Sequence, residues 1–274
     1  MQTTASLWEL LCRDFESERT SARSDQYGEI AHKFVQAAKR VLRSSSPQLC
    51  DAIEIAGDVC QAAGDFSNAA LRFEEALSKS LRLGATSSAG RLAAKVAILR
   101  DSLGEISEAR MRYEQALAIY ERARDHSQHV MLLNQLAAVC KRAGDFAEME
   151  KNYRRAMEVA ASLHDQNHPE VAAAANSLGV ACSETRDFSR AESFHMQALA
   201  IREKCFGPMH PDVAESMANL AFVYHASGDH QKALAFYSGA LQIYKCFRKA
   251  DDPEMRMVIT NRDALLNESV TRTP

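Results

Sequence analysis

A short turn signature recurs five times along this chain at nearly constant spacing. It reads Gly64-Asp65-Phe66, Gly104-Glu105-Ile106, Gly144-Asp145-Phe146, Arg186-Asp187-Phe188 and Gly228-Asp229-His230. Successive copies lie 40, 40, 42 and 42 residues apart. A repeat of this length is one supersecondary unit that stacks on its neighbours, because a single unit cannot bury its own apolar face. The chain is therefore predicted to form a repeat solenoid.

Small and large side chains keep a fixed register to each turn. Twelve residues after each turn begins, every copy has an alanine, and aromatic residues stand nine residues after four of the turns. These positions are Ala76, Ala116, Ala156, Ala198 and Ala240, and Phe73, Tyr113, Tyr153 and Tyr237. Small residues let two antiparallel helices approach closely, and the rings fill the space beside them. Each repeat is therefore predicted to be a helix-turn-helix pair.

Proline marks helix starts at intervals of one period. Pro169, Pro211 and Pro253 are 42 residues apart, and each precedes an acidic residue. Pro47 marks an earlier helix start. Proline at the first helical position gives up an amide that had no partner, and a following acid suits the helix dipole. The proline at 253 predicts a further helix over about residues 253–268.

Composition supports helix and excludes several classes of protein. The 274 residues contain only 11 glycines and 6 prolines, and the net charge of −3 gives no general attraction to nucleic acid. No apolar run is long enough to span a membrane, and charged residues interrupt the segment where a secretory signal would need an apolar block. The seven cysteines form no Cys-x-x-Cys pair. We therefore expect reduced thiols and a cytoplasmic protein.

The alternation of small and large residues resembles the tetratricopeptide repeat, whose unit is usually about 34 residues long. The longer unit here is similar to the variant found in kinesin light chains. Residues 198–244 contain Ala-Leu-x-Ile, the pair His210-Pro211, then Val213-Ala214, and Asn219-Leu220-Ala221 before the turn. The match is close over residues 168–247 and weaker over 47–163. The resemblance implies an all-α fold, a right-handed α-solenoid of tetratricopeptide-like helix pairs.

Three segments are predicted. Residues 47–247 hold five repeats of 40–42 residues, residues 1–46 form a degenerate N-terminal pair that acts as a cap, and residues 248–274 form a C-terminal capping helix and tail. Terminal repeats are expected to be atypical because they cover the core. Trp8, with Leu7, Leu11 and Phe15, is interpreted as part of the capping core. A partner anchor is the alternative role for Trp8.

The sequence lacks the motifs of common catalytic sites. It contains no GxGxxG, GxxxxGK[ST], GxSxG or HExxH. We therefore predict that the protein is not an enzyme, with no cofactor. The pairs His164 with His168 and His126 with His129 provide too few ligands for a metal site, and His168 and His210 are interpreted as residues that begin helices.

The position four residues before each turn carries a small apolar residue in three of the five copies. Cys60, Cys140 and Cys182 share it and are interpreted as buried hydrophobes. Arg100 stands there in the second copy. Either its side chain extends out to solvent, or the first helix of that repeat is shifted by one residue.

In a solenoid of this type the first helix of each repeat lines the concave surface, so the binding positions follow from the register. The predicted partner-binding residues are Asp51, Glu54, Asp58, Arg91, Asn134, Lys141, Asn176, Asn219, Phe222 and His225. The first three place like charges on one helical face, in a segment, residues 44–71, that has no Lys or Arg. A basic partner would relieve this repulsion. A solvated face is the alternative.

The second binding feature is a row of amides. In kinesin light chains an Asn-Asn-Leu-Ala element presents amides to extended cargo peptides, because an amide can both donate to and accept from a peptide backbone. This sequence keeps one Asn of each pair, at 134, 176 and 219. The resemblance therefore implies a peptide groove with a reduced set of amides.

These observations predict a monomeric, non-enzymatic protein-binding adaptor. No heptad pattern in residues 1–46 matches the coiled coil by which kinesin light chains attach to their motor. The resemblance therefore favours the short bacterial kinesin light chains, which accompany bacterial tubulins, and implies a tubulin-like filament as partner. The alternatives are a general cytosolic scaffold for extended peptides and a membrane-surface adaptor that uses the N-terminal helices.

Overall fold

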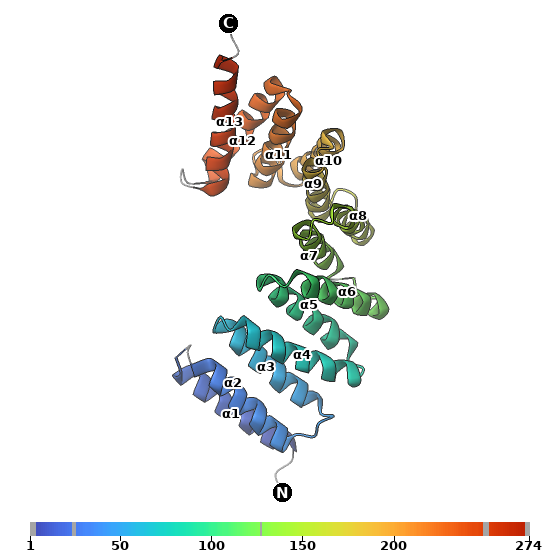
Figure 1. Cartoon of the computed structure of the whole chain (residues 1–274), viewed down its shortest axis with the longest axis vertical. Coiled ribbons are helices and arrows are strands. Elements are labelled where there is room, and N and C mark those ends of the chain that lie inside the picture. The colour runs from blue at the N-terminus through green and yellow to red at the C-terminus, as the bar shows by residue number, and fades with distance from the viewer. Residues whose placement is uncertain (1–3, 24–25, 127, 249–251, 272–274) are drawn as a thin grey trace. The chain divides into compact units, whose positions relative to one another are not determined.

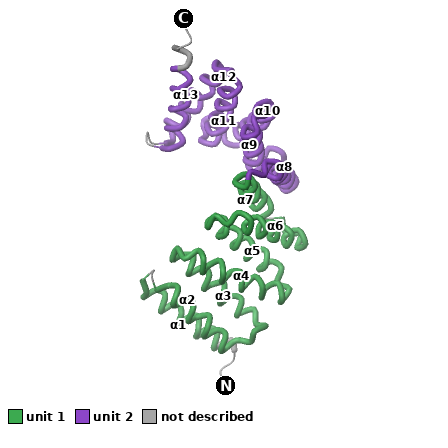
Figure 2. Tube along the Cα trace, viewed as in Figure 1, with its two compact units in different colours: residues 1–143 green, residues 144–274 purple. Residues whose placement is uncertain are grey.

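The computed structural model describes residues 4–23, 26–126, 128–248 and 252–271. Within these ranges the chain forms thirteen α-helices and no strand (Figure 1). The all-α class predicted from the repeat is therefore confirmed. The chain divides into two compact units, residues 1–143 and 144–274, which Figure 2 shows in green and purple.

Unit 1 is a succession of antiparallel helices in which each helix packs on the next one in the sequence. Its helices are α1 (Thr4–Ser21), α2 (Tyr27–Val41), α3 (Pro47–Ala62), α4 (Phe66–Arg82), α5 (Thr86–Ser102), α6 (Ile106–Ala123) and α7 (His129–Arg142). The pairs α3–α4 and α5–α6 are the first two predicted repeats. Because contacts run mainly between sequence neighbours, unit 1 has the construction of a repeat stack.

Unit 2 is built in the same way. Its helices are α8 (Phe146–Leu163), α9 (Pro169–Glu184), α10 (Phe188–Phe206), α11 (Pro211–Ser227), α12 (His230–Phe247) and α13 (Pro253–Thr271). The pairs α9–α10 and α11–α12 pack closely, and α13 packs on α12. The helix predicted at 253–268 is thus present and begins at the predicted proline. The unit boundary falls inside the third predicted repeat, and the division into cap, repeats and C-terminal segment stays a prediction.

The turns lie where the signature places them. Residues 64, 104, 144, 186 and 228 all have positive φ, between 61° and 89°, and the one that is not glycine is Arg186. A left-handed residue at this point ends the first helix of a pair. The aspartate that follows then begins the second helix. Asp65, Asp145, Asp187 and Asp229 each accept a hydrogen bond from the backbone amide three residues later.

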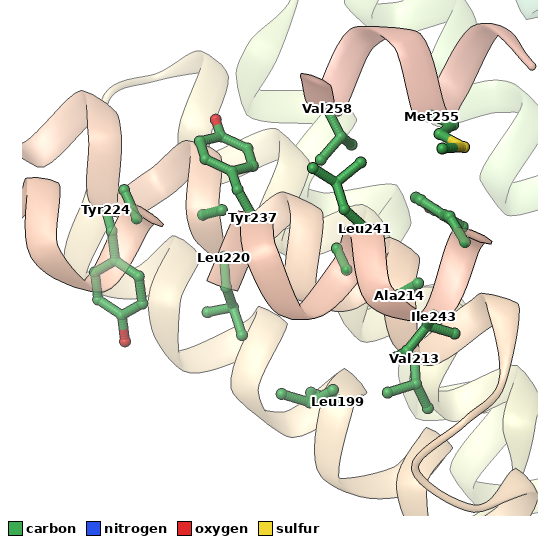
Figure 3. Close-up of a cluster of buried hydrophobic side chains, with 14 of the residues drawn as sticks. Leu199, Val213, Ala214, Leu220, Tyr224, Tyr237, Leu241, Ile243, Met255 and Val258 are labelled. Carbon is green, nitrogen blue, oxygen red and sulfur yellow. The ribbon is translucent and has the colours of Figure 1, made fainter. Parts of the chain in front are cut away.

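The small-residue register forms the core in both units. The five alanines twelve residues past each turn are completely buried. Cys60, Cys140 and Cys182 are at most 2% exposed. In unit 2, Leu220 of α11, Tyr237 and Leu241 of α12, and Met255 and Val258 of α13 belong to one apolar cluster (Figure 3). The predicted close helix crossings are therefore confirmed.

Arg100 resolves the one irregularity of the register. The buried positions of α5 match those of α3 with an offset of 40 residues, so the helix is not shifted. The Arg100 guanidinium instead reaches Glu74 at 3.1 Å and Glu105 at 2.6 Å. Its stem extends out of the slot, and two carboxylates bind its head.

Candidate functional site

The first-helix surface of unit 1 carries a network of ion pairs. We call the surface of α3 and α5 formed by Asp51, Glu54, Asp58, Arg91 and Lys95 the charged face. Glu54 is only 8% exposed and pairs with Arg91 and Lys95, the latter at 3.0 Å. Asp58 accepts from Lys95 at 2.6 Å. The like-charge repulsion on α3 is thus relieved by cations of the next repeat, and the predicted role of Glu54 in partner binding stays a prediction.

The other predicted residues of unit 1 differ in environment. Asp51 is exposed at its surface side, but neighbouring groups remove part of its hydration. This partial desolvation, together with the nearby Glu54 carboxylate, raises the pKa of its carboxyl group. Lys141 and Asn134 are half-buried on α7. The Oδ1 atom of Asn134 is buried and accepts no hydrogen bond from the residues that the structure describes. We call Asp51, Glu54 and Asp58 of α3 the acidic stripe. Within the described part of unit 1, Asp51 is the one member of this stripe that is exposed and has no ion pair.

A shallow hollow of about 410 Å³ lies beside the charged face. Its lining includes Arg91 and Lys95, together with the exposed apolar side chains of Ile98 and Met131. The cations are paired with Glu54 and Asp58, and Asp125 also lines the hollow, so it combines charged groups of both signs with exposed hydrocarbon.

The first-helix surface of unit 2 is held together by hydrogen bonds of side-chain amides. We call the surface formed by Asn176, His195, Glu215, Asn219 and Phe222 the amide face. Asn176 Oδ1 accepts from His195 Nδ1 and from Asn219 Nδ2, both at 2.9 Å. Asn176 Nδ2 donates to Glu215 at 3.1 Å. Asn176 is only 8% exposed, and its amide joins α9, α10 and α11. Its predicted role in partner binding stays a prediction.

His195 is a component that the sequence analysis did not identify. It stands nine residues after the fourth turn, at the position where the other repeats have Phe or Tyr. Its ring is 1% exposed and packs against Gly179, where an added Cβ would lie 2.6 Å from the ring. Phe73 packs on Gly57 in the same way at 2.6 Å. The break in the aromatic register, together with the glycine, was the signal that could have revealed it.

The protonation of His195 follows from its partner. Asn176 Oδ1 can only accept, so His195 Nδ1 carries the hydrogen and Nε2 is left as an acceptor. Burial, reinforced by the Arg202 guanidinium, lowers the pKa of His195 to about 4. The imidazole is therefore neutral near pH 7.

A hollow of about 300 Å³ opens on the amide face. It is lined by Val180, Ser183, Glu184, His195, Asn219 and Phe222. Phe222 is 50% exposed, so its ring offers apolar surface at this opening. Asn219 donates one amide hydrogen to Asn176, and its side chain is half-buried at the hollow. His225 is half-buried and packs on His230, with ring centroids 6.0 Å apart. The structure thus brings Asn219 and Phe222 together around one opening.

The aromatic side chains of α1 pack inside unit 1. Phe15 is buried and stacks on Phe34 of α2, with ring centroids 4.1 Å apart, and Trp8 lies 6.2 Å from the same ring. This packing favours the capping interpretation of Trp8 over a partner anchor. Across the residues that the structure describes, no helix has the length and apolar character needed to cross a membrane.

Comparisons with known proteins agree with this geometry. A family model for the tetratricopeptide repeat matches residues 127–204 and 191–245. Residues 127–245 are tetratricopeptide repeats. The helix pairs upstream follow the same register, so the fold class is that of a tetratricopeptide-type α-solenoid scaffold. Scaffolds of this type mediate protein interactions and are generally not catalytic.

Several solved structures share the fold of this chain. BtubC (BKLC) from P. vanneervenii is 28% identical, with a TM-score of 0.65 and coverage of 89% of this chain and 94% of that one. A putative kinesin light chain of Podospora anserina is 21% identical, with a TM-score of 0.63 and coverage of 74% and 99%. YrrB, described as a TPR protein with an unusual peptide-binding site, is 17% identical, with a TM-score of 0.54 and coverage of 84% and 99%. No curated protein sequence matches the chain.

Proposed function

We propose that this chain is a cytoplasmic, non-enzymatic adaptor whose amide face binds an extended protein segment, and that its partner is a tubulin-like filament. The observation that carries the binding site is the hollow where the exposed Phe222 ring lies beside the Asn219 amide. An aromatic ring offers an apolar contact for a side chain, and an amide can bind a peptide backbone.

The filament part of the proposal is supported by the resemblance to bacterial kinesin light chains. The similarity to BtubC (BKLC) extends over most of both chains, whereas the more distant structures support the fold alone. A general scaffold for extended peptides uses the same groove and differs only in the partner. The membrane-surface alternative is disfavoured, because the Trp8 and Phe15 rings of α1 pack on Phe34 of α2.

Co-sedimentation with assembled bacterial tubulin filaments tests both parts. Phe222→Ala and Asn219→Ala change the hollow without removing the buried Asn176 amide. Met196→Ala is the matched control, because it also removes an exposed apolar side chain from unit 2, on α10. We expect filament binding by the parent and by the control, and weaker binding by the Phe222 and Asn219 variants. Thermal melts of all four proteins report whether the fold is retained.

The outcomes separate the candidates. Equal binding by all four proteins would mean that the partner uses another face. If the parent itself does not sediment with filaments, the filament is excluded. Selection from a displayed library of extended peptides, with Phe222→Ala as the counter-selection, then tests the general peptide scaffold.

A further inference from the structure

The connection between α8 and α9 gathers three side chains that can bind a metal ion. His164 follows the end of α8, His168 precedes α9, and Glu170 lies in its first turn. One ligand atom from each lies within 4.8 Å of the others. Within the described ranges this is the one group of three His, Cys, Asp or Glu residues at such distances. The two histidines alone lacked the required number of ligands, and the structure supplies Glu170 as the third.

The three groups are close and accessible. His164 Nε2 lies 3.3 Å from Glu170 Oε2, and the two imidazole rings stack with their centroids 3.7 Å apart. His164 and Glu170 are both exposed, and His168 is half-buried. An ion can therefore enter from solvent, and water can complete its coordination.

The next connection along the chain shows which part of this arrangement serves the fold. There Phe206 stacks on His210 at 4.5 Å, and His210 Nδ1 accepts from the amide of Asp212 at 3.2 Å, just as His168 Nδ1 accepts from the amide of Glu170 at 3.3 Å. A phenylalanine thus fills the stacking position as well as a histidine does. The imidazole at 164 supplies a ligand nitrogen that stacking does not require.

We propose that His164, His168 and Glu170 bind a divalent transition-metal ion of the zinc class, with water as the fourth ligand. Two imidazoles and one carboxylate are a donor set that suits Zn²⁺. Tetrahedral ligand atoms around zinc lie about 3.3 Å apart, and the three groups here already lie within 4.8 Å of one another. The planes of the two imidazoles differ by only 11°, so one ring must rotate out of the stack before both nitrogens face the same ion. This site is independent of the proposed peptide groove.

Binding competes with the helix cap. An imidazole that accepts a hydrogen bond at Nδ1 carries its hydrogen on Nε2. His168 therefore loses the cap bond whichever nitrogen binds the metal, because Nδ1 either turns to the ion or takes the hydrogen that leaves Nε2. The cap bond is long, which limits this cost. We therefore expect reversible binding rather than a permanent structural zinc.

The test is titration with Zn²⁺ alone, followed by calorimetry, and with Co²⁺, followed by its visible absorption. Cys205 Sγ lies 2.9 Å from the carbonyl oxygen of Asn167 in the same connection. The unmodified chain is therefore titrated beside Cys205→Ser, which removes this thiol and is the parent of every further variant. In that background, His164→Phe keeps the stacking group of the next connection but removes a ligand. Glu170→Gln removes the carboxylate charge.

We expect one site in the parent and at least tenfold weaker binding in both variants, since loss of even an outer partner commonly costs about 10- to 100-fold in metal affinity. Phe206→His is the gain-of-function arm, because it places an imidazole beside His210 and Asp212 and should add a second site. Equal affinity in the parent and His164→Phe would overturn the proposal. So would loss of all binding on Cys205→Ser alone, which would assign the metal to the thiol.

Discussion

The charged face of unit 1 and the amide face of unit 2 occupy equivalent positions in the repeat but are held together differently. On the charged face, Glu54 and Asp58 of one repeat pair with Lys95 of the next through partly exposed ions. On the amide face, Asn176 joins His195 through a buried hydrogen bond and Asn219 through a partly buried one, and all three side chains are uncharged. The same helix pairing thus accommodates two kinds of polar contact between repeats.

The difference predicts opposite sensitivities. Ion pairs at a solvated surface are screened by salt and contribute little individually, whereas a buried neutral network is insensitive to salt and costly to leave unpaired. The amide face also contains a histidine that must stay neutral, so it should respond to pH. Four experiments test this contrast, in order of expected effect.

The largest effect concerns His195 and acid. Its pKa is about 4 in the folded protein and about 6.5 in an unfolded chain. Because the unfolded chain takes up the proton first, this contribution to stability is complete above pH 6.5. It is lost as the pH falls toward 4, by about 3 kcal/mol in total. Urea unfolding at a series of pH values, followed by circular dichroism, measures the loss.

His195→Phe is the matched variant, because Phe73 fills the same position against Gly57. Carboxylates and His129 titrate in both proteins, so the difference between the two pH profiles isolates His195. Superimposable profiles between pH 7 and 4.5 would contradict the assignment of a neutral buried imidazole.

The second effect is removal of the central amide. Asn176→Ala leaves His195 Nδ1 and one Asn219 amide hydrogen without their partner, and should lower the free energy of unfolding by about 2 kcal/mol. Asn134→Ala is the control, since Asn134 occupies the same register position in unit 1 and its buried oxygen accepts no hydrogen bond among the described residues. We expect almost no change for the control. Similar losses for both variants would show that the network adds nothing.

The third effect is on the charged face. Glu54→Gln keeps the shape of the side chain but removes the charge that pairs with Arg91 and Lys95. Both cations are partly exposed and can be hydrated instead, so we expect a loss of only about 1 kcal/mol. Denaturant unfolding measures it. A loss as large as that of Asn176→Ala would mean that the two faces are equally dependent on buried partners.

The smallest effect is that of the outer pair. Asp58→Asn removes the carboxylate that pairs with Lys95. Because the Asp58 side chain is half exposed, the free energy of unfolding should fall by about 0.5 kcal/mol or less. The loss should vanish in 1 M NaCl, where charges are screened within about 3 Å. Thermal melts at low and high salt are sufficient. A loss that persists in high salt would indicate a packing role for Asp58.

The repeat architecture could be predicted from sequence because its signals are local and recur. A left-handed turn residue and a completely buried alanine recur in all five copies, and an aspartate cap recurs in four of them. Each depends on backbone geometry within one helix pair, so the copies confirm each other. The direction of Arg100 needed the structure. A single sequence position does not reveal that Glu74, from another helix, lies within reach.

The candidate site was predicted only in part. Register alone placed Asn176, Asn219 and Phe222 on one surface, and the structure agrees on the helices that carry them. It could not show that Asn176 is buried, because its partners His195 and Glu215 come from two other helices and are 19 and 39 residues away. Hydrogen bonds between distant residues leave no periodic trace in the sequence.

The sequence by itself determined the helix pairs, their turns and the residues that pack them, because these follow from local conformational preference and from burial at a fixed period. Only the tertiary structure decided which polar groups satisfy one another. The acidic stripe of α3 is matched by cations of α5, and His164 and His168 gain Glu170 as a neighbour. The physical reason is that charge and hydrogen-bond pairing depend on distances of a few ångströms between side chains of different helices, which the repeat period does not specify.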